Sequence, residues 1–180
     1  GESGNAGFIG AVCINNRKGS AFASTPFPEG DRFDLDFVAH EMGHQFGANH
    51  TWSFESEGSG VQAEPASGTT IMGYAGIVPG NNVALVGEDY FHYYSVAQIS
   101  EYISGISCGI AEPIINTAPT IIPSRDYLIP EATAFVLEGE AIDSDPTDVL
   151  TYAWEQIDDG VVTSVTFGPE NPSGANFRSR

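Results

Sequence analysis

The sequence predicts an α+β first part followed by an all-β sandwich. Residues 34–47 and 91–104 carry apolar side chains at the spacing of amphipathic helices. After Cys108 the composition changes, and short strand-like runs alternate with turn signals through the rest of the 180 residues. These observations predict a first domain at 1–112, a linker at 113–118 and a β-sandwich at 119–180.

The first 33 residues are predicted to form two short strands and a loop. Strand-like runs at 8–14 and 20–24 flank a turn at 15–19, and a Pro/Gly loop covers 25–33. A helix is then expected to begin near Asp34, because aspartate favours a helix start through capping and through the helix dipole. Gly47 predicts its end, since glycine readily adopts the left-handed conformation found after helices.

The remaining predicted elements are a loop region, a second helix and the strands of the sandwich. Residues 52–70 are polar and read as a loop, which is followed by the apolar pair Ile71–Met72. His92 precedes the second helix, and we expect it to be a helix-start or core histidine that makes hydrogen bonds. Strands are expected at 133–142, 150–156 and 161–167.

The charge balance excludes some classes of partner. Twenty-four acidic residues oppose six basic ones, for a formal net charge of −18. Nucleic acids and anionic membranes would repel such a chain. No apolar run approaches membrane-spanning length. The oligomeric state stays open, and composition alone leaves the two cysteines as either a disulfide or two buried thiols.

The segment from His40 to His50 matches the pattern H-E-x-x-H-x-x-G-x-x-H at every fixed position. His40 and His44 are four residues apart, so one helix face presents both imidazoles to one ion. Gly47 allows a sharp turn that returns His50 as the third ligand. Three neutral imidazoles leave a fourth zinc position open for water, as catalysis requires. A chance match has a probability on the order of 10⁻⁷ per window.

These residues predict a hydrolase in which Zn²⁺ activates water and polarises a carbonyl. Glu41 is the expected general base, and it can pass the proton to the leaving amine. Two other functions remain open. The chain could be a secreted adhesion or binding protein whose zinc region is a non-catalytic relic, although the intact Glu41 argues against this. It could also be a zinc hydrolase that acts on something other than peptides.

The zinc motif together with Met72 in Thr70-Ile71-Met72-Gly73-Tyr74 resembles the metzincin metallopeptidases. The resemblance is closest to bacterial reprolysin/adamalysin-like members. It implies a zinc endopeptidase that acts on protein or peptide substrates, with Met72 as the base beneath the zinc site and not a ligand. Two positions depart from the adamalysin pattern. Thr51 stands where Asp usually follows the third histidine, and Tyr74 has the spacing of the tyrosine that can bind zinc in astacins and serralysins.

The resemblance also implies features outside the motif. It implies a disulfide between Cys13 and Cys108, a secreted location, and an edge strand at residues 6–13 that pairs with bound peptide. Only 39 residues precede His40, so we expect the upstream half of the catalytic domain to be missing from this chain. Tyr74 is a candidate catalytic residue beside Glu41, with simple packing as the alternative.

Residues 119–180 resemble an immunoglobulin-like or cadherin-like module, which we expect to be truncated at Arg180. Trp154 is the expected core tryptophan of a central strand. Three aspartates in this part, Asp143, Asp145 and Asp148, are candidate ligands for Ca²⁺ as a second cofactor. Turn chemistry is the alternative reading of the three aspartates, and it is the favoured one.

Overall fold

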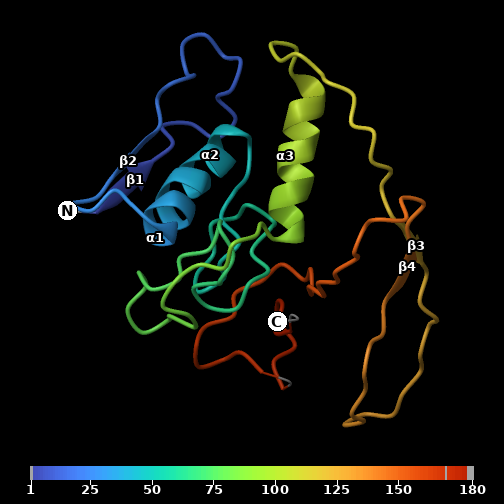
Figure 1. The fold of residues 1–180 in the computed structure, drawn as a ribbon. Coiled ribbons are helices and arrows are strands. Elements are labelled where there is room, and N and C mark those ends of the chain that lie inside the picture. Colours follow the sequence, from blue (N-terminus) through green and yellow to red (C-terminus); the bar gives the residue numbers. More distant parts are fainter. Residues whose placement is uncertain (1, 169, 178–180) are drawn as a thin grey trace. The chain divides into compact units, whose positions relative to one another are not determined.

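The computed structural model describes residues 2–168 and 170–177, and it divides the chain into two compact units. Unit 1 comprises residues 1–109 and 155–180, and unit 2 comprises residues 110–154. Figure 1 shows the elements of both units along the chain. The boundaries 1–112, 113–118 and 119–180 remain a prediction from the sequence, whereas the structure groups the described residues after Trp154 with unit 1.

Unit 1 begins with a small antiparallel sheet. Strand β1 (Ser3–Asn5) pairs with β2 (Phe22–Ser24), with Ser3 opposite Ser24. The predicted strand at 20–24 is therefore present in shortened form. β1 runs past the helix that carries Glu41, and a Cβ added at Gly4 would lie 2.2 Å from Oε1 of Glu41. A larger residue at position 4 would therefore require the Glu41 side chain to move.

A continuous helical run carries the first two histidines. It consists of α1 (Asp31–Phe33), a π-helical segment η1 (Asp34–Ala39) and α2 (His40–Gln45). The run begins at Asp31, three residues before the predicted start, directly after Gly30 with its φ of 80°. The π-helical turns end where His40 begins, and such turns are frequent at functional sites.

The run ends as predicted at Gly47, whose φ is 97°. The amide of Gly47 donates to the carbonyl of His44, and that of Ala48 donates to Gly43. These bonds use carbonyls that a helix C-terminus leaves free. A Cβ at Gly47 would also lie 3.1 Å from Cβ of Tyr102, so a larger residue there would push Tyr102 away by a few tenths of an ångström.

The predicted edge strand at 6–13 is wrong. The segment consists of turns and bends, with positive φ angles at Gly7, Gly10 and Cys13 that a strand does not accommodate. Its amides also have other acceptors: Gly10 donates to the carbonyl of His44 and Ala11 to that of Gln45, both at 2.8 Å. The segment therefore closes the C-terminal end of α2 instead of extending the sheet.

The second predicted helix is confirmed as α3 (Tyr93–Gly105). His92 occupies its N-cap, and the side chain of His92 accepts a hydrogen bond from the amide of Tyr94, as expected for a helix-start histidine. Between α2 and α3 the chain forms loops, coloured cyan to green in Figure 1. The core is formed by Ala48, Ile71 and Met72, on which four partly buried side chains pack. These are Leu35, Ala39, Phe91 and Ile99.

Cys13 and Cys108 form the disulfide that the family resemblance implied. The bond joins the segment between β1 and β2 to the residues that follow α3. No helix among the described residues is long and apolar enough to cross a membrane.

Removing this disulfide by replacing both cysteines with serine is expected to lower the free energy of unfolding by about 4–5 kcal/mol. The bond closes a loop of 95 residues, so its loss frees considerable entropy in the unfolded chain. Denaturant unfolding of the parent and the double variant measures the difference. Two freely alkylated thiols in native, unreduced protein would contradict the pairing itself.

Residues 155–164 pack against the loops that follow α2. Val162 is fully buried, its amide donates to the carbonyl of Ser53, and its carbonyl accepts from the amide of Ala66. The carboxylate of Glu155 accepts from the amide of Tyr93 at 2.7 Å. These bonds explain why the segment, which the sequence assigns to a β-sandwich, belongs structurally to unit 1.

Unit 2 contains one antiparallel pair, β3 (Thr120–Ile122) and β4 (Glu140–Ile142), with Thr120 opposite Ile142. β4 coincides with the end of the predicted strand 133–142. Many apolar side chains of this unit are exposed, including Leu128 and Val136, and Trp154 is 37% exposed. The unit shows no second sheet, so the immunoglobulin-like module stays a sequence-based prediction.

Candidate metal centre

Three histidines converge beside α2. His40 and His44 come from successive turns of the helix, and His50 comes from the loop after Gly47. One ring nitrogen of each lies within 4.8 Å of the corresponding nitrogen of the other two. The Nε2 atoms of His44 and His50 are 3.0 Å apart. The motif spacing therefore brings together the three side chains that the sequence predicts as ligands.

The Nδ1 atom of each imidazole has its own acceptor. His40 donates to the carbonyl of Ile71 and His44 to the carbonyl of Ala48, both at 2.7 Å. His50 faces the carboxylate of Glu57 at 2.9 Å. Since a carbonyl oxygen can only accept, Nδ1 of His40 and His44 carries the proton and Nε2 keeps its lone pair. Three neutral nitrogens with supported rings fit Zn²⁺ in donor type and number.

The pKa values of the three histidines favour the neutral form. Burial, reinforced by the nearby charge of His44, lowers the pKa of His40 to about 3. The same two causes lower the pKa of His50 to about 3. Burial also lowers the pKa of His44, although its bond to Ala48 opposes the shift. All three groups are therefore uncharged at neutral pH, as ligands to a cation must be.

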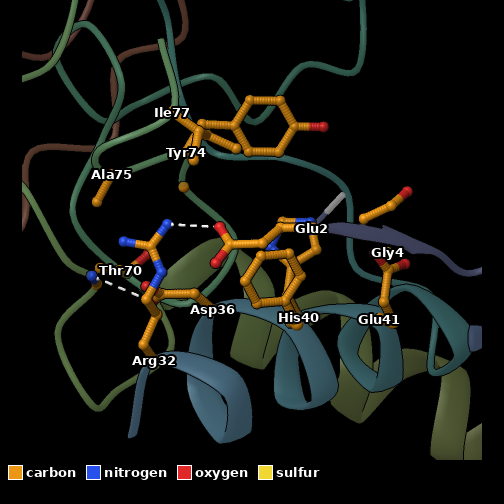
Figure 2. Close-up of a pocket in the computed structure, with 14 residues that line it drawn as sticks. Glu2, Gly4, Arg32, Asp36, His40, Glu41, Thr70, Tyr74, Ala75 and Ile77 are labelled. Carbon is orange, nitrogen blue, oxygen red and sulfur yellow. Dashed lines mark hydrogen bonds and ion pairs between the residues drawn. The ribbon is translucent and has the colours of Figure 1, made fainter. Parts of the chain in front are cut away.

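Glu41 lies beside this cluster and is largely buried between α2 and β1. Figure 2 shows its side chain next to His40 and close to Gly4. Burial raises the pKa of the Glu41 carboxyl to about 7. A carboxyl with a pKa near neutrality suits both proton uptake and proton release during a reaction.

Met72 lies directly under the helix and is fully buried. A Cβ added at Gly43 would lie 2.5 Å from its Sδ atom, so the glycine is needed for the methionine to approach α2. The preceding residue, Ile71, supplies the carbonyl that holds His40. The turn around Met72 therefore packs against α2 and orients one of the three histidines.

Tyr74 also reaches the cluster. Its ring centroid lies 4.5 Å from that of His50 and 5.7 Å from that of His40. Burial, with Glu57 and Glu41 nearby, raises the pKa of its hydroxyl to about 12. The side chain is therefore a neutral hydrogen-bond donor over the whole neutral range.

A pocket of about 290 Å³ adjoins His40 and Glu41. Figure 2 shows it between the helical run and the segment around Tyr74, with Arg32 and Asp36 also in its lining. Arg32 forms an ion pair with Glu2 at 2.9 Å, and Asp36 accepts from the amide of Gly87. A second depression is lined by residues 4–9 and the three histidines, and it lies over the histidine cluster.

Several residues near the histidine cluster belong to no sequence motif, so the sequence does not identify them as part of the site. Glu57 and Glu64 lie in the stretch 52–70, which reads only as a polar loop. Trp52 stacks on His50 with ring centroids 5.5 Å apart. The sequence shows that Thr51 replaces the usual Asp after the third histidine, but it does not show which residue Thr51 contacts. In the structure its hydroxyl donates to Oε1 of Glu64 at 2.5 Å.

The three aspartates of unit 2 lie close together and accept hydrogen bonds from within the unit. The carboxylates of Asp143, Asp145 and Asp148 lie within 4.8 Å of one another. They accept hydrogen bonds from the amide of Asp145, the amide of Thr117 and the side chain of Asn116, respectively. Only the bond between Asp143 and Asp145 is a local turn bond, because Thr117 and Asn116 lie 28 and 32 residues before their acceptors. None of these contacts supports a calcium site.

Comparison with known proteins adds one finding. A family model described as "Metallo-peptidase family M12B Reprolysin-like" matches residues 1–102. No curated protein and no solved structure matches the chain. The match covers more than half of the chain and includes every residue of the histidine cluster.

Proposed function

Because the chain belongs to the reprolysin-like metallopeptidases of family M12B, we propose that it is a zinc-dependent endopeptidase with Glu41 as its general base. The observation that carries the proposal is the cluster of three neutral imidazoles beside a buried carboxylate. His40, His44 and His50 would hold the ion. The alternative, a binding protein whose zinc region is a non-catalytic relic, lacks support, because the proposed base and all three proposed ligand residues are present together.

Zn²⁺, when bound, polarises the scissile carbonyl and lowers the pKa of water. Glu41 accepts a proton from the attacking water as the new C–O bond forms. It then delivers that proton to the amine nitrogen as the C–N bond breaks. A carboxyl with a pKa of about 7 can perform both transfers near neutral pH.

The disulfide supports the further proposal that the enzyme is secreted. Disulfides persist in oxidising compartments and are rare in reducing ones. The finer kinship with bacterial members is part of the same proposal and rests on the motif residues Val38–His44 and Thr70–Met72.

Metal analysis combined with a peptide-library digest tests the proposed function. We expect one zinc per chain, cleavage within peptides, loss of cleavage after chelation and recovery when zinc is restored. Replacing His44 with alanine should abolish both zinc binding and cleavage. A purified chain without zinc, or cleavage that persists in the chelated protein, would contradict the proposal.

Zinc is expected to stay bound as the pH falls through 6.5, where exposed imidazoles become protonated. The pKa values of His40 and His50 lie below the ordinary value, at about 3. The neutral ligand form therefore persists to lower pH, and protons displace zinc only further into the acid range. Zinc retained after gel filtration across a pH series measures this. Half-release near pH 6.5 would contradict it.

Tyr74 is proposed to assist catalysis by donating a hydrogen bond to the oxyanion, with weak ligation of the resting metal as the alternative role. Its protonated hydroxyl and its proximity to His50 support this. Tyr74→Phe removes only the hydroxyl, so turnover is expected to fall by about 10²-fold while zinc affinity and thermal stability change little.

The matched control is Tyr93→Phe, because Tyr93 is exposed on α3. Initial rates on one peptide substrate provide the measurement for both variants. If Tyr74→Phe cleaves as fast as the parent, Tyr74 packs against the turn and has no part in the reaction.

A further inference from the structure

The third histidine of the cluster is supported differently from the other two. Main-chain carbonyls of Ile71 and Ala48 hold His40 and His44. His50 lies in a loop, and its Nδ1 faces both oxygens of Glu57, at 2.9 and 3.0 Å. Its Nε2 faces His44 instead. Glu57 therefore lies on the side of the imidazole that points away from the cluster.

The loop that carries Glu57 is closed by a buried glutamine. Gln62 is 3% exposed, and its side-chain oxygen accepts from the amide of Glu57 at 2.7 Å. Its side-chain nitrogen donates to the carbonyls of Trp52 and Glu55. One side chain thus binds both ends and the middle of the stretch 52–62, which fixes the backbone of Glu57 opposite His50.

Residues from the far end of the chain hold this glutamine. The amide of Gln62 donates to Oδ1 of Asp159 at 2.8 Å, and the amide of Gly160 donates to the carbonyl of Gln62 at 3.2 Å. The buried Val162 adds a bond to Ser53 in the same loop. Asp159 and Gly160 lie outside residues 1–102, which the family model matches. A continuous series of hydrogen bonds therefore runs from this segment to His50.

We infer that Glu57 is a positioning residue of the metal centre, and that residues 159–160 support it through Gln62. The inference rests on the zinc binding proposed above. A carboxylate on Nδ1 fixes the orientation of a ligating imidazole and makes its other nitrogen a better donor to metal. The charge-assisted bond is also stronger than the carbonyl bonds of His40 and His44. The bond to Glu57 therefore holds the His50 ring in place, although His50 lies on a loop and not on a helix.

Zinc affinity, measured by competition with a chromophoric chelator, tests the inference. Glu57→Ala is expected to weaken binding by about 10–100-fold. Glu57→Gln should lose less, because its amide oxygen still accepts from Nδ1. The matched control is Glu55→Ala, an exposed acid in the same loop, which should bind zinc like the parent. Asp159→Ala should weaken binding more than Asp158→Ala, its exposed neighbour.

Thermal unfolding of the metal-free variants separates positioning from general stability. Positioning requires a loss of zinc affinity in Glu57→Gln with a melting temperature near that of the parent. If the parent binds zinc tightly and both Glu57 variants bind equally well, the inference is overturned while the proposed function stands. If the parent binds no zinc, both are overturned. If zinc binds as expected but no peptide is cleaved, only the proposed function fails.

Discussion

Replacing Glu41 with glutamine is expected to slow peptide cleavage by a factor of about 10²–10⁴ while zinc remains bound. The side chain belongs to α2 but is not one of the three clustered nitrogen donors. Glutamine has the same shape, so it fits beneath Gly4, where space is tight. The substitution removes the proton acceptor alone and leaves the ligands in place.

Steady-state cleavage of one peptide and zinc content per chain are the two measurements. Glu101→Gln is a suitable control, because Glu101 is an exposed acid on α3 of the same unit. Near-parent turnover in Glu41→Gln would show that another group takes the proton. Loss of zinc in the same variant would show that Glu41 contributes to the metal site.

Replacing Glu64 with alanine is expected to reduce the free energy of unfolding by roughly 3–5 kcal/mol, because it leaves several buried donors without an acceptor. Glu64 is 1% exposed. Its carboxylate accepts from the hydroxyls of Thr51 and Thr70. It also accepts from the amides of Thr69 and Thr70, at 2.8 and 2.9 Å.

The contacts of Glu64 predict a second effect on the metal centre. Thr51 directly follows His50, and Thr70 directly precedes Ile71, whose carbonyl holds His40. Glu64 therefore connects the third histidine to the turn that contains Met72. We expect Glu64→Ala to weaken zinc binding as well as to destabilise the fold.

Denaturant unfolding of the metal-free protein measures the first effect, and chelator competition measures the second. Glu55→Ala serves as the control, since Glu55 is an exposed carboxylate in the same loop region. A change of less than about 1 kcal/mol in Glu64→Ala would mean that water replaces the lost acceptor, as it does at exposed sites.

Glu64 is also the partner of Thr51, the residue that departs from the adamalysin pattern. A carboxylate directly after the third histidine is absent here, and Thr51 instead donates to a carboxylate thirteen residues later in the chain. The acid that contacts the residue after the third histidine is therefore Glu64. A single sequence contains no signal that connects these two positions.

The sequence by itself determined the elements whose information is local. Spacing along one helix places His40 and His44 on one face, Gly47 ends that helix, and the pattern at 91–104 yields α3. The same motif made Glu41 and His50 candidates for the site. The helix predictions are confirmed because helical periodicity and backbone preferences act over a few neighbouring residues.

The tertiary structure decided the features that depend on contacts between distant residues. Residues 6–13 form turns because α2 offers them free carbonyls, and 155–164 join unit 1 because loops 52–66 offer amides and carbonyls to bind. Glu57 and Glu64 gain their roles in the same way. A carboxylate in a polar loop is chemically identical whether it faces solvent or an imidazole, and only packing places it beside its partner.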